Sequence, residues 1–198
     1  PAVEVIVGGL ELATLVFMNL EEDEDGQYEI KGIKYSEMDL QIVDTGYGLE
    51  RFCWATAGTP TIYEAIYPKS IDWLKSLCEF DNKIKHINIQ DLDNLLGELS
   101  KISGIMNIEV GSDENEIFSK LIERLSERKI NVESEQVKEL MNTLSKIYAI
   151  PDHLHALCNM LGDGLVPSNA KEGYLARMMS RRVMRMRDEL GINKTLPE

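Results

Sequence analysis

The hydrophobic pattern of this 198-residue chain changes at one short segment, residues 44–51, and that change constrains the fold more than any other feature. Before the segment, short runs rich in Val, Leu, Phe and Thr are separated by glycines, which is typical of β-strands. After it, leucine and isoleucine recur at intervals of three and four residues, which indicates amphipathic helices. The sequence therefore predicts an α+β fold, with an antiparallel sheet first and helices after it.

The first 45 residues or so are expected to form strands at residues 3–7, 13–20, 28–34 and 38–43. No helical pattern separates them, so antiparallel pairing is favoured. Residues 21–26 are five acids and a glycine, and we expect a solvated hairpin tip that self-repulsion keeps open. The alternative is a metal site, but adjacent acids on a mobile turn do not preorganise a coordination shell.

The remaining chain is expected to be helical, with the polar segment 81–91 as a linker between domains 1–80 and 81–198. Asp113 or Ser112 is expected to cap one helix, and Asn131 or Ser134 the next. Proline cannot supply a helical N–H, so Pro151 is expected to interrupt that second helix. Helical periodicity is found around residues 71–78, 92–102, 114–125, 134–150 and 152–162.

The last helix is expected from about Ala170 to Leu190, with Gly191 as its C-terminal stop. Residues 171–187 within it carry six basic residues and one acid, although the whole chain has a net charge of -13. The overall charge opposes non-specific binding to nucleic acid, whereas the local charge of +5 favours it. Arg177, Arg181 and Arg185 lie four residues apart on one face, which is either a phosphate-binding face or a set of partners for acids elsewhere.

The segment 44–51 reads Asp-Thr-Gly-Tyr-Gly-Leu-Glu-Arg and joins a predicted strand to a predicted helix. Glycine there lets a ligand approach the backbone, and arginine suits phosphate binding and base stacking. The segment matches neither G-x-G-x-x-G nor G-x-x-x-x-G-K-[ST]. It is therefore either a nucleotide site of another kind or a plain turn in which Glu50 pairs with a neighbour.

Cysteine and histidine give no metal or disulfide pattern. Cys53, Cys78 and Cys158 are far apart and odd in number, so a reducing cytoplasm is the expected location. No signal peptide is expected in this sequence, and it has no apolar run long enough to span a bilayer. His153 and His155 are two apart and do not face one another on a helix, and His86 is isolated, so no metal site is predicted.

Three segments in order resemble the alanyl-tRNA synthetases of the archaeal type: residues 10–19, the segment 44–51, and residues 149–182 with its V-P-S-N-A-K-E-G-Y-L-A-R. The resemblance implies a class II synthetase sheet followed by a helical tRNA-recognition region. It also implies that the chain is a piece of a longer enzyme and lacks that family's motifs 1 and 2. The reaction implied is alanine plus ATP, with Mg²⁺, giving alanyl-adenylate, followed by acyl transfer to tRNA(Ala).

The resemblance assigns the amino-acid and ATP sites to the first part of the chain. Asp44 would anchor the ammonium of alanine, and Gly46 and Gly48 would form a flat floor. Arg51, the motif 3 arginine, would lie against ATP, with Glu50 orienting it. The strand that carries Thr14 and Asn19 would line the amino-acid pocket.

The resemblance assigns RNA recognition to the last part. Asn169 would help to read the guanine–uracil wobble pair of the acceptor stem, because an amide both donates and accepts hydrogen bonds. Arg177, Arg181 and Arg182 would contact phosphates, which position the RNA. The isolated chain is expected to be inactive without the rest of the parent synthetase. The alternatives are a non-catalytic tRNA-binding module or a synthetase-like paralogue.

Overall fold

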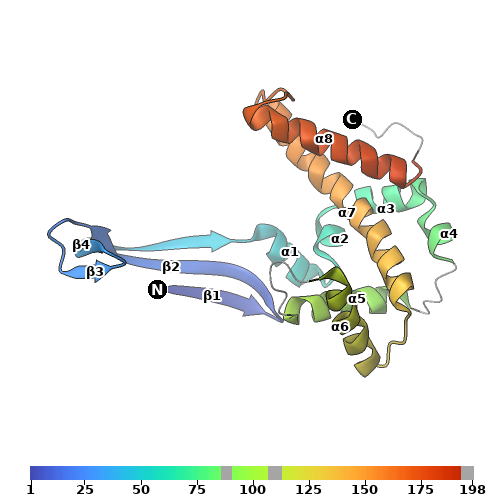
Figure 1. Ribbon diagram of the computed structural model, residues 1–198, viewed down its shortest axis with the longest axis horizontal. Helices are drawn as coiled ribbons and strands as arrows, with labels where there is room; N and C mark the ends of the chain where they lie inside the picture. The colour runs from blue at the N-terminus through green and yellow to red at the C-terminus, as the bar shows by residue number, and fades with distance from the viewer. Residues whose placement is uncertain (86–90, 107–112, 193–198) are drawn as a thin grey trace. The chain divides into compact units, whose positions relative to one another are not determined.

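The computed structural model describes residues 1–85, 91–106 and 113–192. The chain divides into two compact units, Pro1–Ala57 and Gly58–Glu198. The first contains the strands and one helix, and the second contains the other helices (Figure 1). The predicted α+β class with an antiparallel sheet is confirmed.

The sheet of the first unit has the strand order β1-β2-β4-β3, and all of its pairings are antiparallel. β2 and β4 are its long central strands (Figure 1). Strand β4 continues to Tyr47, so the first half of the segment 44–51 is strand, and only Gly48 separates it from α1. The bounds are β1 Ala2–Val7, β2 Leu10–Glu22, β3 Tyr28–Ile30, β4 Ile33–Tyr47 and α1 Leu49–Ala57.

Two strand predictions need correction. Residues 28–34 are not one strand, because Lys31 and Gly32 have φ values of 52° and 82° and form the tight turn between β3 and β4. Two successive residues with positive φ are typical of a two-residue β-hairpin. Glu21 and Glu22 of the acidic segment are the end of β2, and the rest of the segment connects β2 to β3. Both strands pair with β4, so this is a turn between non-neighbouring strands and not a hairpin tip.

The first unit buries very little of its apolar surface. Among residues 1–57, all of which the structure describes, the only buried hydrophobic residues are Leu12 and Ala13. Helix α1 buries none of its side chains. Large apolar side chains such as Val5, Phe17 and Val43 remain exposed on the strands. The sheet therefore does not enclose a core of its own.

The second unit is helical and holds almost all of the buried hydrophobic residues. Its long helix α7 packs against α3, α6 and α8, while α5 packs against α6 (Figure 1). The bounds are α2 Ile62–Ile66, α3 Pro68–Leu77, α4 Phe80–Ile84, α5 Leu92–Ile105, α6 Glu114–Glu127, α7 Ser134–Gly162 and α8 Lys171–Glu189.

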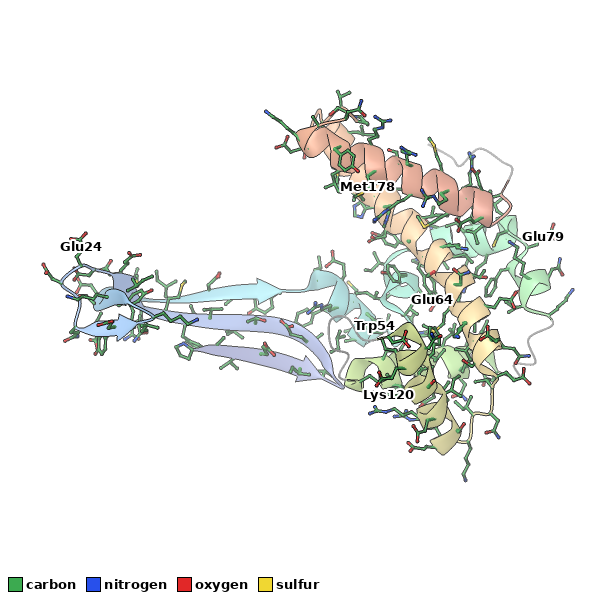
Figure 2. The ribbon with its side chains drawn as sticks, in the orientation of Figure 1. Glu24, Trp54, Glu64, Glu79, Lys120 and Met178 are labelled. Atoms are coloured by element: carbon green, nitrogen blue, oxygen red, sulfur yellow. The ribbon has the colours of Figure 1, made fainter. Side chains whose placement is uncertain are left out.

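A polar cluster joins α2, α3 and α7 inside this unit. Glu64, labelled in Figure 2, accepts hydrogen bonds from Lys75 at 3.2 Å and from the hydroxyl of Tyr148 at 3.1 Å. The rings of Tyr148 and Tyr63 stack with their centroids 5.2 Å apart. Burial, with the neighbouring Glu64 carboxylate, raises the pKa of Tyr148 well above its usual value. Tyr148 therefore stays a neutral donor at physiological pH.

Pro151 does not interrupt its helix, which corrects the sequence prediction. Helix α7 runs continuously from Ser134 to Gly162, and Pro151 is buried within it together with Ile150. Proline costs one backbone hydrogen bond in a helix interior. Here the apolar contacts of the buried helix face offset the lost hydrogen bond, so the helix continues through Pro151.

The predicted caps and linker also differ from the structure. Asp113 is at the N-cap of α6 without a side-chain hydrogen bond, and Ser112 lies outside the described residues. The N-cap of α7 is Glu133 rather than Asn131 or Ser134. The predicted linker begins inside α4, whose Phe80 is buried, and residues 86–90 with His86 lie outside the described part.

The boundary between the two compact units falls between residues 57 and 58 of the chain, whereas the sequence predicts a domain boundary after residue 80. Residues 62–77 fold as α2 and α3, and α3 contributes Ile71 and Leu74 to the core of the helical unit. Compactness alone does not define a domain in the functional sense. The division into 1–80 and 81–198 therefore stays a prediction.

Candidate functional sites

The register of β2 and β4 gathers several predicted site residues on one face of the sheet. Thr14 pairs with Gly46, and Val16 pairs with Asp44. Alternate residues of a strand share a face, so Thr14, Asp44 and Gly46 lie on the same side. Asn19 falls where the register shifts between Met18 and Leu20, so the strand pairing does not place it on this face.

The two glycines differ in what surrounds them. A Cβ added at Gly48 would lie 2.8 Å from Cδ of Arg51 and 3.1 Å from its Cγ. A Cβ added at Gly46 would meet only the Thr14 carbonyl oxygen, at an ordinary 3.9 Å. Gly48 therefore makes room for the Arg51 side chain, whereas Gly46 leaves open space above the sheet.

Arg51 is held by Glu11, at the start of β2. Its Nη1 donates to the backbone carbonyl oxygen of Glu11 at 2.8 Å and lies 3.5 Å from the Glu11 carboxylate. Thr14 donates its hydroxyl hydrogen bond to the same carboxylate. Glu50, for which this orienting role was predicted, is exposed and forms no hydrogen bond or ion pair with Arg51 among the interactions of residues 1–57.

Glu11 was missed because its proximity to Arg51 depends on register. The Gly48 amide donates to the Leu12 carbonyl at 3.0 Å, which brings the start of α1 beside the start of β2. Nothing in the spacing of residues 11 and 51 shows this. The side chain of Asp44 is exposed in this chain. An exposed carboxylate pairs weakly until a ligand or more protein covers it.

The second candidate site lies on α8. Asn169, Arg177, Arg181 and Arg182 line one surface hollow of about 410 Å³, so the structure brings the four predicted RNA-binding residues together. Tyr174, Met178 and Arg185 line the same hollow, and Met178 is labelled on α8 in Figure 2. The opposite stripe of the helix is buried through Gly173, Ala176 and Val183.

The arginines of this hollow form no ion pairs within the described part of the protein. Among the ion pairs of the described residues, none involves Arg177, Arg181, Arg182 or Arg185. Other contacts anchor the C-terminal end of the helix, since Lys83 donates to the Leu190 carbonyl at 2.6 Å and Lys146 pairs with Glu189 at 2.9 Å. The hollow is therefore a positively charged surface with free guanidinium groups.

Tyr174 was overlooked by the sequence analysis. It is three residues before Arg177 in Gly173-Tyr174-Leu175-Ala176-Arg177, and its side chain is 55% exposed. Exposed aromatic rings beside arginines are suited to stacking on nucleic-acid bases. Its i, i+3 spacing from Arg177 was the available indication.

The histidines and acids do not assemble a metal site in the described residues. No group of three or more potential metal ligands occurs in residues 1–85, 91–106 or 113–192. His155 shares a hydrogen bond of 2.9 Å with the Tyr67 hydroxyl, and His153 Nδ1 lies 3.6 Å from Asp152.

In the acidic turn, Asp23 accepts hydrogen bonds from the Asp25 amide and the Ser36 hydroxyl. The Ser36 bond is the main cause that lowers the pKa of Asp23.

Comparison with known proteins identifies the family of this chain. The sequence profile of the family described as "tRNA synthetases class II (A)" matches residues 1–198. The chain belongs to this synthetase family. The resemblance to archaeal alanyl-tRNA synthetases is thereby confirmed.

Three relatives of this synthetase chain illustrate the similarity. It is 46% identical over 198 residues to the alanine–tRNA ligase of Archaeoglobus fulgidus, a match that covers 99% of the chain and 21% of that ligase. It is 45% identical to the ligase of Natronomonas pharaonis and 44% identical to that of Methanosarcina mazei, with the whole chain and 20% of each relative covered. The chain thus spans about a fifth of the length of these relatives.

Among the described residues, no helix combines the length and the apolar character that crossing a bilayer requires.

Proposed function

We propose that this chain is part of an alanine–tRNA ligase and supplies its motif 3 and its acceptor-stem recognition surface. The ligase would join alanine to ATP as alanyl-adenylate with release of pyrophosphate. It would then transfer the alanyl group to the terminal ribose of tRNA(Ala) with release of AMP. Such an enzyme acts in protein synthesis in the cytoplasm.

The face with Thr14, Asp44 and Gly46 supports the amino-acid part of the proposal. Asp44 would hold the alanine ammonium, and the open space above Gly46 would receive a small substrate. The guanidinium of Arg51 is anchored on Glu11 with half of its side chain exposed, so it can still meet an ATP phosphate or base. Adenylate formation depends mostly on positioning and charge neutralisation, which are the roles these groups fit.

Mg²⁺ would arrive with the phosphates of ATP. The described residues contain no cluster of carboxylates, histidines or cysteines that would hold it. We therefore assign no metal-dependent step to this chain.

The exposed apolar side chains of the sheet support a role within a larger catalytic domain. Within residues 1–57 only Leu12 and Ala13 are buried, and most of the large apolar side chains on the strands are exposed. A sheet of this kind needs further packing to be stable in water. In the complete ligase, the rest of the catalytic domain would cover it and would supply the missing contacts to the α-phosphate.

The observation that carries the proposal is the hollow on α8, where an asparagine amide and four arginines meet. Arginines that contact phosphates would fix the acceptor stem, and Asn169 would read a base pair. The first prediction follows: Asn169→Ala in the complete ligase lowers discrimination between wobble and Watson–Crick acceptor stems by about 1–3 kcal/mol. The measurement is kcat/KM for aminoacylation of two minihelices that differ only in that pair.

An equal loss on both stems would contradict the recognition role of Asn169. Tyr28→Phe, a change on β3 far from α8 in the sequence, is the matched control and should leave discrimination unaltered.

A non-catalytic tRNA-binding module is the second candidate, and the same hollow supports it. The two functions separate in an assay of the isolated chain. We expect no alanine-dependent exchange of pyrophosphate into ATP, together with weak, salt-sensitive binding of an acceptor-stem minihelix. Adding the chain to a ligase that lacks these residues should restore exchange if the chain is a catalytic component, and should not if it only binds RNA.

A further inference from the structure

The loop before α8 is folded back onto the first turn of that helix. The Ser168 amide donates to the Gly173 carbonyl oxygen at 2.9 Å. The Ser168 hydroxyl donates to the Ala170 carbonyl oxygen at 2.9 Å and accepts from the Ala170 amide at 3.4 Å. These three bonds enclose Asn169, the residue between Ser168 and Ala170.

Gly173 is what allows this close approach. It is buried, and a Cβ added there would lie 2.5 Å from the Val166 carbonyl oxygen and closer still to Ser168 Oγ. The same Cβ would be 3.0 Å from Ser168 Cβ. A backbone carbonyl cannot move aside as the end of a flexible side chain can, so any larger residue at 173 must push the loop away.

The backbone of the loop is also held in a rare conformation. Lys171 has φ 51°, which places a non-glycine residue in the left-handed region. Such conformations persist only where the surrounding structure holds them, and they concentrate at functional sites. The bonds from Ser168 and the contact at Gly173 provide that support on the N-terminal side of α8.

None of these contacts involves the side chain of Asn169 itself. In the hydrogen bonds of the described residues, its amide group has no partner, although the residue lines the hollow with Tyr174 and Arg177. A group that reads a base edge must be held to within about 0.5 Å of its working position. The loop supplies that precision through the backbone and leaves both the donor and the acceptor of the amide free.

We propose that Gly173 and Ser168 are positioning residues for Asn169. Base-pair discrimination then depends on a contact between two residues that do not themselves touch the RNA. This inference rests on the proposed function for its biological meaning. The clamp itself, defined as the Ser168–Gly173 contact, is a property of the chain and can be tested without RNA.

The test uses two variants of the clamp and one control. Gly173→Ala places a methyl group against Val166 and Ser168. Ser168→Ala removes the hydroxyl and its two bonds but adds no bulk. Gly162→Ala is the matched control, because Gly162 is also helical and a Cβ there would meet nothing within 4 Å.

The first measurement is amide hydrogen exchange in the 198-residue chain. The Ser168 amide should be protected in the wild type and in Gly162→Ala, and should lose protection in Gly173→Ala while the amides of α8 from Ala176 onward keep theirs. An unprotected Ser168 amide in the wild type would overturn the clamp whatever the function of the protein is.

The second measurement is the ratio of kcat/KM on wobble and Watson–Crick minihelices in the complete ligase. Gly173→Ala should lower this ratio by at least about fivefold, near the weaker end of what one good base contact provides. Ser168→Ala should lower it less, and neither variant should change the salt dependence of RNA binding that the arginines set. If Gly173→Ala unfolds α8, Ser168→Ala decides the question.

The outcomes separate the two proposals. A wild-type enzyme without discrimination, but with a protected Ser168 amide, would refute recognition by Asn169 and the positioning role with it, while leaving the clamp intact. Discrimination that is lost in Asn169→Ala but retained in both clamp variants would overturn the positioning role alone.

Discussion

At the scale of single residues, glycine serves two different needs in this chain. Gly48 leaves room for its own neighbour Arg51, and Gly173 leaves room for the loop that carries Asn169. Gly46 is different, because nothing in the protein is close enough to exclude a larger residue. A glycine that the protein does not require is consistent with a site where a ligand approaches the backbone.

This difference gives the second prediction. Gly46→Ala should leave the thermal unfolding of the chain nearly unchanged, because its Cβ would make only an ordinary contact. In the complete ligase the same change should raise KM for alanine by about 10–200-fold, the usual effect of one extra carbon in a tight pocket. Steady-state adenylate formation measures it, and an unaltered KM would place the alanine site elsewhere.

Cysteine reactivity gives the third prediction. Cys78 is buried, and burial raises the pKa of its thiol, whereas Cys53 and Cys158 are exposed. Because the thiolate is the reactive form, Cys78 should resist alkylation in the native chain. Titration with a thiol reagent should show two fast groups and a third only after denaturation. Cys158→Ser should remove one of the fast groups, and three fast groups in the wild type would contradict the packing of Cys78.

At the scale of elements, α8 divides its surface between core and solvent. Gly173, Ala176 and Val183 are buried, and the arginines line the hollow on the other side. Residues four apart rise about 6 Å along a helix. Arg177, Arg181 and Arg185 therefore present a regular row of charges to a phosphate backbone.

The fourth prediction concerns this row. Arg181→Gln should weaken binding of an acceptor-stem minihelix by a similar factor for every sequence tested and should reduce the slope of log K against log salt by about 1. Lys120→Gln on α6 is the control, because Lys120 is exposed and pairs with Glu116 at 2.6 Å. An unchanged slope for Arg181→Gln would mean that this guanidinium does not meet a phosphate.

At the scale of the whole molecule, the two units differ in how they are stabilised. The helical unit holds a continuous cluster of buried side chains that extends from Ile71 to Ile192. The sheet unit buries Leu12 and Ala13 and otherwise depends on backbone pairing. Burial of apolar surface is the main favourable term in folding, so the units should differ in autonomy.

The fifth prediction tests that difference. A polypeptide of residues 58–198 should show a cooperative thermal transition by circular dichroism, whereas residues 1–57 alone should show none and should expose apolar surface to a hydrophobic dye. A cooperative transition in the short piece would mean that the sheet is stable without further covering chain.

The sequence by itself determined the order of strands and helices and the position of the basic helix, because local periodicity and glycine placement act over a few residues. It also determined the family, through motifs in linear order. It failed at Pro151, where burial of α7 outweighs a local helix breaker, and at residues 31–32, where a turn divides a segment predicted as one strand.

Only the tertiary structure decided which distant residues meet. Glu11 reaches Arg51 through the pairing of β2 with the end of β4, and Gly173 reaches Val166 and Ser168 because the loop folds back on α8. Such contacts depend on register and close packing, which are fixed by many weak interactions summed over the fold. No local pattern of residues encodes them, and they set the geometry of both candidate sites.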